Sequence, residues 1–249
     1  MAHGYHLLQH WNKWLAQNFL GDSLLQTEQQ LMMTTLNKHF GKHALLIGVP
    51  QQNSLFNATT IPCHTLASPI RTTDTTISTY IESDFHELPI FTGSIDLVML
   101  PHTLEMVDNP RQLLSEACRI IKPEGLIIIT GFNIYSFFGL KKLFVKEKIM
   151  PWRANFIHTY HLQQWLRLAD FQIERQERGF FRPPLTNQSL FHKINILEKI
   201  GKTCIPALGG VYTILARAKV IPLTPIRLKW KQQLSSIQVS STIPGNMAR

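Results

Sequence analysis

Cysteine is scarce, since the 249 residues contain only Cys63, Cys118 and Cys204, widely spaced and without a C-x-x-C pair. This spacing predicts neither a disulfide framework nor a cysteine metal site, and it favours a reducing compartment. The start lacks a basic segment leading into an apolar one, and the most apolar stretch, 205–223, contains Arg217 and Lys219. We therefore expect a cytoplasmic protein with no signal peptide and no transmembrane segment.

Acidic residues are sparse in the second part of the chain. Residues 1–140 hold 7 Lys/Arg and 11 Asp/Glu, a balance of −4, whereas residues 141–249 hold 18 and 5, a balance of +13. A cationic surface of this kind attracts nucleic acid, an anionic membrane surface or an acidic partner. Solvated helix faces and a basic tail are the alternative explanation, which we prefer for Lys141, Lys142, Lys146 and Lys148.

Several catalytic motifs are absent, namely G-x-x-x-x-G-K-[ST], H-E-x-x-H and G-x-S-x-G. The histidines are dispersed: His3, His6 and His10 share a helical face near the start, and the pairs His39/His43 and His158/His161 have no evident third ligand. A zinc site needs three or four such ligands together. The sequence therefore predicts no bound metal.

Apolar periodicity predicts two helices over 5–40, broken near Gly21–Asp22, followed by alternating strands and helices. Strands are expected at 43–49, 60–66, 79–82, 94–100, 126–130, 171–174 and 211–220, and helices from Pro110, capped by Asn109, and at 162–168 and 189–200. Strands that alternate with helices in this way indicate a doubly wound α/β fold. We expect N-terminal helices over 1–41, an α/β domain over 42–220 and a basic, mobile tail over 221–249.

Ligands of doubly wound sheets bind beyond the carboxyl ends of the strands. The polar segments there begin at Ser83–Asp84, at Pro101–His102 and at Gly131. His102 is a candidate general base because imidazole titrates near neutrality, and a structural histidine is the alternative.

One long segment carries a family resemblance. Residues 83–130, SDFHELPIFTGSIDLVMLPHTLEMVDNPRQLLSEACRIIKPEGLIIIT, resemble the type 11 group of class I S-adenosylmethionine-dependent methyltransferases, closely here and loosely over 43–180. The resemblance implies a mostly parallel seven-stranded sheet and S-adenosylmethionine as cofactor. It further implies that Asp84 binds the adenine amino group with Phe85 beside it, and that Leu100, Pro101 and His102 line the methionine side.

The glycine-rich loop departs from that family. Gly48 remains, but Leu46 stands in place of the acidic residue of the first strand, and Pro50 and Gln52 replace the second and third glycines. The second strand also lacks the acidic residue that normally binds the ribose. Side-chain hydrogen bonds from Gln51, Gln52 and Asn53 are the available substitutes, so Gly48 and Gln51 join the candidate cofactor residues.

Aromatic residues in the basic half are open to more than one interpretation. Core packing, cover of a substrate pocket, and stacking on bases beside Arg182 would each account for them; they are Trp152, Phe156, Trp165, Phe180 and Phe181. The D/N-P-P-Y/F tetrapeptide of amino-methyltransferases of nucleic acids is absent. Two functions remain: methyl transfer to a small or medium acceptor, or a non-catalytic module of the same fold that binds an anionic partner through its basic C-terminal surface.

Overall fold

The structure is a computed structural model, which describes residues 2–36, 39–72, 77, 79–85, 87–145, 149–185, 191, 198, 201–203 and 205–220. The expected tail over 221–249 and most of the expected helix over 189–200 lie outside these residues. The proposed division at residues 41 and 220 therefore stays a prediction. Within the described part, no helix is long and apolar enough to cross a bilayer.

A seven-stranded sheet organises the molecule, in the order β3-β2-β1-β4-β5-β7-β6. Strand β7 is antiparallel to both of its neighbours, and the other pairs are parallel. The strands are β1 (His43–Ile47), β2 (Cys63–Ser68), β3 (Tyr80–Glu82), β4 (Ile95–Pro101), β5 (Ile121–Phe132), β6 (Phe171–Gly179) and β7 (Val211–Ala218). The expected doubly wound, mostly parallel α/β sheet is confirmed, with β2 starting three residues later and β5 running longer than the sequence indicated.

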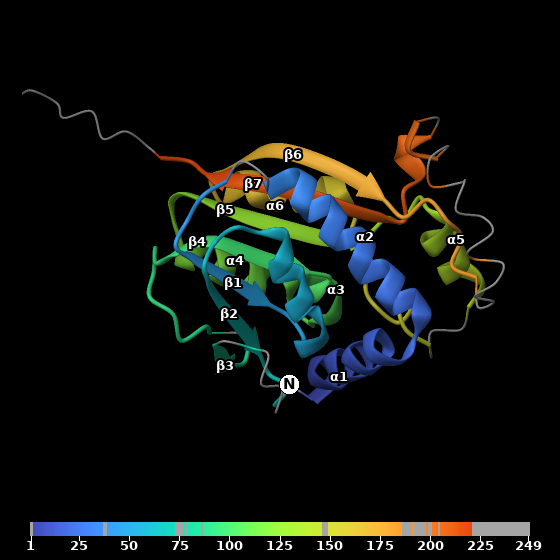
Figure 1. Ribbon diagram of the computed structural model, residues 1–249, viewed down its shortest axis with the longest axis horizontal. Helices are drawn as coiled ribbons and strands as arrows, with labels where there is room; N and C mark the ends of the chain where they lie inside the picture. Colours follow the sequence, from blue (N-terminus) through green and yellow to red (C-terminus); the bar gives the residue numbers. More distant parts are fainter. Residues whose placement is uncertain are drawn as a thin grey trace, which may run out of the picture.

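The central strands are buried on both faces, because alternate residues of a strand point to opposite sides. Leu45 and Ile47 of β1 belong to a core shared with α4 (Pro110–Ile120) and α6 (Thr159–Leu168). Ala44 and Leu46 belong to a second core, with the end of α2 (Phe19–Leu36) and the 3-10 helix η1 (Pro50–Ala58). Figure 1 shows α2 in front of the sheet and α4 behind it.

Helix α1 (Ala2–Gln17) precedes α2, and the two are separated at Asn18. The break expected at Gly21–Asp22 was therefore placed wrongly. Gly21 lies inside α2, where a Cβ would come within 2.8 Å of the Leu15 backbone. The glycine thus serves close packing of α2 on the end of α1 rather than helix termination.

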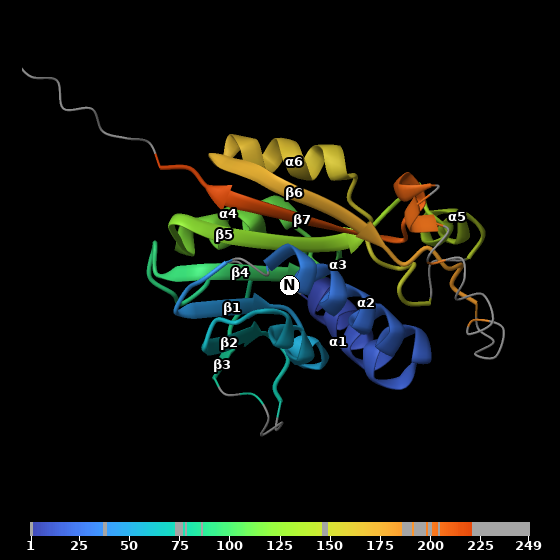
Figure 2. The same ribbon diagram turned by 45° about the horizontal axis from the view of Figure 1, so that its top comes forward.

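Helix α1 covers the carboxyl edge of the sheet. It contacts η1, which follows β1, and α3 (Thr103–Met106), which follows β4. Figures 1 and 2 both show α1 beside the ends of these strands and below α2. The N-terminal helices therefore lie over the edge at which ligands of this sheet type bind.

Candidate functional site

The loop after β1 is closed by the side chain of Gln52. Its Oε1 accepts a hydrogen bond from the Val49 N–H at 3.0 Å, and its Nε2 donates to the Pro101 carbonyl at 2.8 Å. The side chain is fully buried. Gly48 makes room for it, since a Cβ on Gly48 would overlap the Gln52 Oε1. The amide therefore joins the end of β1 to the end of β4 with its hydrogen-bonding groups satisfied internally.

His102 lies at the end of β4, in the left-handed region with φ 56°, and its side chain is fully buried. Its Nδ1 is 2.8 Å from Oε2 of Glu105, and its Nε2 contacts Oε1 of Glu28 on α2. Burial alone would lower the pKa of His102, but the two carboxylates outweigh it and raise this pKa to about 9. Burial also raises the pKa of Glu105, which accepts the Phe132 N–H at 2.9 Å.

This cluster of Glu28, His102 and Glu105 joins α2 to the end of the sheet. A protonated imidazole donates from both ring nitrogens and has no lone pair left to accept a proton. Both nitrogens face carboxylates of the protein itself. The structure therefore supports the structural role of His102 over the role of general base.

Helix α1 packs directly onto the cluster. The Trp11 side chain is buried, with its ring centroid 5.4 Å from that of His102 and 6.0 Å from that of Phe132. On the neighbouring loop, Asn12 Oδ1 accepts the Gln51 N–H at 3.1 Å. The backbone group of Gln51 that would face a ligand is thus already bonded to α1.

The remaining candidate residues divide into two groups. Gly48, Leu100, Pro101 and His102 come together, buried, at the ends of β1 and β4. Asp84 and Phe85 follow β3, at the far side of β2, where Asp84 is exposed and Phe85 is in the core. Roles in cofactor binding for these residues and for Gln51, whose side chain is exposed, stay predictions.

Sequence reasoning missed the part played by Glu28. A signal was present, because Glu28 is spaced from Leu24 and Leu31 as residues of one helical stripe are, and both leucines are buried. An acidic residue inside an apolar stripe indicates a buried partner. The identity of that partner, 74 residues away in the sequence, was not accessible from the pattern.

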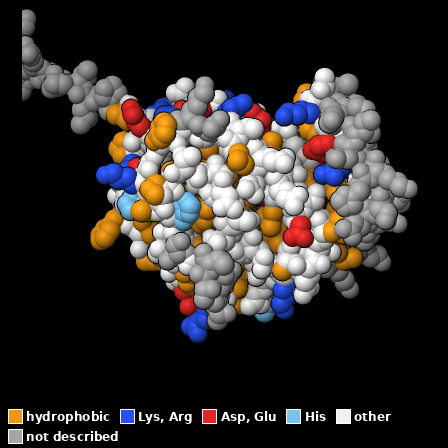
Figure 3. Space-filling model, in the orientation of Figure 1, with side chains coloured by type: hydrophobic (Ala, Val, Ile, Leu, Met, Phe, Trp, Pro, Cys, Tyr) orange, Lys and Arg blue, Asp and Glu red, His pale blue; other side chains and the backbone are white. Residues whose placement is uncertain are grey.

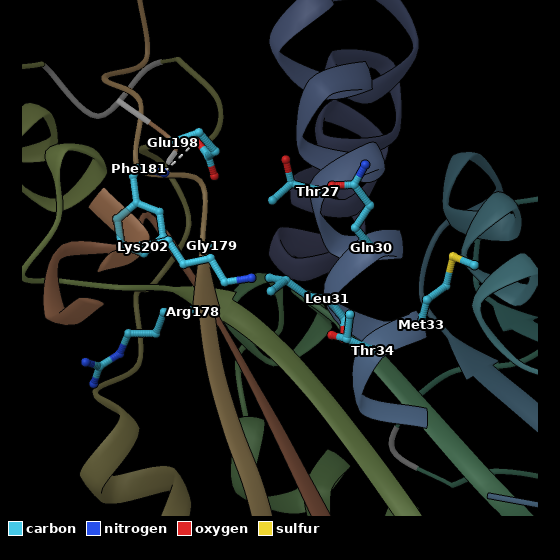
Figure 4. A pocket seen from close by; sticks show the side chains of 10 residues that line it. All are labelled: Thr27, Gln30, Leu31, Met33, Thr34, Arg178, Gly179, Phe181, Glu198 and Lys202. Atoms are coloured by element: carbon cyan, nitrogen blue, oxygen red, sulfur yellow. Dashed lines mark hydrogen bonds between the residues drawn. The ribbon is translucent and has the colours of Figure 1, made fainter. Parts of the chain in front are cut away.

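A cavity of about 440 Å³ lies elsewhere, between α2 and the end of β6. Figure 4 shows Thr27 and Leu31 of α2 on one side and Lys202, whose side chain extends toward Leu31, on the other. The nearby Glu198 carboxylate accepts the N–H groups of Phe180 and Phe181. None of the predicted site residues lines this cavity.

The strand order, the antiparallel β7 and the helices on both faces define a class I methyltransferase fold. In agreement, residues 63–129 match the family model described as a methyltransferase domain, of the type 11 group. The chain therefore has the class I methyltransferase fold, and its residues 63–129 are similar to the type 11 methyltransferase domain.

One curated protein and two solved structures are similar to this chain. The Escherichia coli K12 protein YafS is 34% identical over 148 residues, which are 58% of this chain and 57% of YafS. The chain thus spans little more than half the length of that curated relative. A methyltransferase structure from Thermotoga maritima is 18% identical with a TM-score of 0.60, covering 88% of this chain and 100% of its own. One from Archaeoglobus fulgidus is 20% identical with a TM-score of 0.54, covering 80% and 98%. At these identities the two structures show a shared fold.

The cofactor implied by that fold does not fit the residues at the ends of β1 and β4 as they are arranged. The Val49 N–H and the Pro101 carbonyl are bonded to Gln52, and the Gln51 N–H is bonded to α1. An acidic ribose ligand is absent from the end of β2, where the Ser68 carbonyl accepts the hydroxyl of Tyr80. These four backbone groups at the ends of β1, β2 and β4 are therefore bonded within the protein.

Proposed function

We propose that this chain is a non-catalytic binding module of the methyltransferase fold, whose basic C-terminal half binds an anionic partner. The observation that carries the proposal is the buried Gln52 amide, which bonds the ends of β1 and β4 to each other. A ligand at this position would have to break both hydrogen bonds and displace Trp11 and the rest of α1. An open arrangement without a ligand would leave the Val49 N–H and the Pro101 carbonyl buried without partners. Because this is costly, the closed arrangement is strongly favoured.

The excess of Lys and Arg in residues 141–249 supports an anionic partner. The aromatic residues of this half bear on whether that partner is a nucleic acid. Trp152, Phe180 and Phe181 are buried, which favours core packing over stacking on bases. On the face that carries α2, the Lys and Arg side chains that are drawn lie at the periphery and form no continuous stripe (Figure 3). A groove that follows a nucleic-acid backbone needs such a stripe. We therefore expect the partner to bind at another part of the basic half.

A second candidate function is methyl transfer from S-adenosylmethionine to a small or medium acceptor. The match of residues 63–129 to the methyltransferase domain family favours it, as does the exposed position of Asp84 after β3. For this function α1 and the loop 48–52 would have to move away from the ends of β1 and β4. None of the residues that the structure describes is placed to act on an acceptor in the present arrangement, so we derive no catalytic step.

Calorimetric titration with S-adenosylhomocysteine separates the two functions. For the binding module we expect no heat of binding and no thermal stabilisation up to millimolar ligand. Micromolar affinity would contradict it and support the enzyme. In that case Asp84→Ala should weaken binding, whereas Glu87→Ala, which removes an exposed carboxylate three residues away, should not. Equal affinity of the two variants would remove Asp84 from the cofactor site.

A further inference from the structure

Helix α5 (Phe137–Phe144, FFGLKKLF) presents its apolar side chains to solvent and turns its lysines toward the protein. The exposed side chains on the helix are Phe137, Leu140, Leu143 and Phe144, with Leu143 80% and Phe144 81% exposed. At 100° per residue these four positions fall within one third of the helix circumference. Tyr135 and Ile149, just outside the helix, are exposed as well. These six residues are called the α5 apolar face below.

The two lysines are held on the inner side. Lys141 Nζ donates to the Pro184 carbonyl at 2.7 Å and lies 4.4 Å from the centroid of the Trp152 ring. Lys142 Nζ donates to the Ala154 carbonyl and lies 4.4 Å from the centroid of the Phe156 ring. The expectation that these lysines form a solvated helix face was therefore wrong. Burial lowers the pKa of Lys141, whereas the carbonyl oxygens and aromatic rings favour the charged form of both lysines.

The orientation of α5 is fixed by its first turn. Ser136 caps the helix by accepting the N–H groups of Phe138 and Gly139. The Phe138 side chain is buried against Phe132, and a Cβ on Gly139 would overlap the Ile134 carbonyl. The helix cannot rotate to bury its outer side chains without losing these contacts. Exposure of the α5 apolar face is consequently built into the fold.

The segment that contains Ile205 and Leu208 extends the α5 apolar face. Asn133 donates to the Ala207 and Gly209 carbonyls, which places the exposed Ile205 and Leu208 next to the start of α5. Figures 1 and 2 both show α5 at the end of the molecule away from β3. At ~100 Å² per side chain, the six residues alone reach the upper limit of the ~300–600 Å² that the largest apolar patch on a monomer covers. A patch of this size indicates an interaction surface.

The positive charge near the α5 apolar face indicates the kind of partner that binds there. The described residues 133–145 and 149–160 contain Lys141, Lys142 and Arg153 and no Asp or Glu, a balance of +3. A twofold interface between two copies would bring this charge against itself. Large apolar and aromatic side chains close to cationic residues, with no acidic residue beside them, are typical of helices that lie in the interface of an anionic bilayer. We propose that the α5 apolar face docks on the surface of an anionic lipid bilayer, the anionic partner on which the proposed function rests.

Sedimentation of the full chain with phosphatidylcholine vesicles, with and without phosphatidylserine, tests this docking. We expect binding that needs phosphatidylserine and weakens with added salt. The double variant Leu143→Glu/Phe144→Glu should bind at least about tenfold more weakly, because it removes two inserting side chains and adds two negative charges.

A matched control carries the same two substitutions at equally exposed positions. Phe91 is 89% exposed before β4 and Leu168 is 84% exposed at the end of α6, both at the amino ends of strands and opposite to α5. The variant Phe91→Glu/Leu168→Glu should bind like the unchanged chain. Equal weakening of the two double variants would overturn the assignment to α5. Should Leu143→Glu/Phe144→Glu fail to fold, the double serine variant at the same positions repeats the test.

Two further outcomes would also overturn the proposal. One is the absence of vesicle binding by the unchanged chain at low salt. The other is a dimer in sedimentation velocity that Leu143→Glu/Phe144→Glu converts to monomer, since the face would then bind a second copy. Calorimetry with S-adenosylhomocysteine reports on the proposed function separately, because a chain that binds both this ligand and vesicles would refute the non-catalytic assignment and leave the docking surface in place.

Discussion

Replacing Gln52 by glycine tests whether its amide closes the ends of β1 and β4. The substitution removes two buried hydrogen bonds, to the Val49 N–H at 3.0 Å and to the Pro101 carbonyl at 2.8 Å. Each backbone group left unpaired costs ~1–3 kcal/mol, less where water enters, and the added backbone freedom of glycine costs ~0.5–1 kcal/mol. We expect the free energy of unfolding to fall by roughly 2–5 kcal/mol.

The control is Gln51→Gly, which makes the same backbone change in the same 3-10 helix at an exposed side chain. It should cost only the glycine contribution of ~0.5–1 kcal/mol. At ~2–4 °C per kcal/mol for a chain of this size, the two variants should differ in Tm by roughly 5–15 °C, measured by circular dichroism. Equal melting of Gln52→Gly and Gln51→Gly would refute the closing role of the amide.

A double-mutant cycle adds a sharper test, because Gly48 and Gln52 are in contact. Gly48→Ala alone should destabilise strongly, since its Cβ would overlap the Gln52 Oε1. In the Gln52→Gly background that obstacle is gone, so the cost of Gly48→Ala should shrink by ~1–3 kcal/mol. An unchanged cost in both backgrounds would mean that Gly48 is needed for a reason unrelated to Gln52.

Two further predictions concern the cluster and α5. Since the pKa of His102 rises from 6.5 when unfolded to about 9 when folded, its stabilisation is complete below pH 6.5 and is lost as pH rises through 9. Denaturant titrations between pH 6.5 and 9 should show a decline on the order of 3 kcal/mol that is absent in His102→Gln, and parallel curves for the two proteins would contradict the assignment. Gly139→Ala should disrupt the start of α5, because the Cβ would overlap the Ile134 carbonyl, whereas Leu140→Ala at an exposed position should leave the Tm within a few degrees. A folded Gly139→Ala protein of unchanged Tm would show that α5 starts differently.

The fold was predictable because its determinants are local. Each central strand is an apolar run of strand length, as in Leu126–Thr130, and Asn109 and Pro110 mark the start of α4, where Asn109 accepts the Gln112 N–H as expected. The break between α1 and α2 was not predictable, because Gly21 fits both a helix terminus and a close helix contact. Only the packing against Leu15 decides between these two roles.

The arrangement at the carboxyl ends of β1 and β4 depends on contacts between residues distant in sequence. The sequence shows the loss of glycines after β1 and predicts Gln52 as a substitute hydrogen-bonding group. Its partner, however, is the carbonyl of Pro101, 49 residues away, and not a ligand. Likewise His102 was visible as a titratable residue after β4, whereas Glu28, which holds it, lies in an N-terminal helix. Sequence spacing indicates which groups reach this edge of the sheet but not which of them bond to each other.

A retained glycine is therefore weak evidence for a retained cofactor in this chain. Gly48 is the residue of the family's loop that remains, and a ligand is the usual reason for a glycine at that point. Here the space beside Gly48 holds the Gln52 amide, so the glycine is required by the protein's own interior. His102 likewise bonds to the protein itself rather than to a ligand, because its two nitrogens face Glu28 and Glu105. At α5 the relation is reversed, because apolar side chains that usually pack inside are held in solvent while lysines are turned in. Under the proposed function, the surface for an external partner lies at α5, whereas the carboxyl ends of β1 and β4 are filled by buried side chains such as Gln52 and His102.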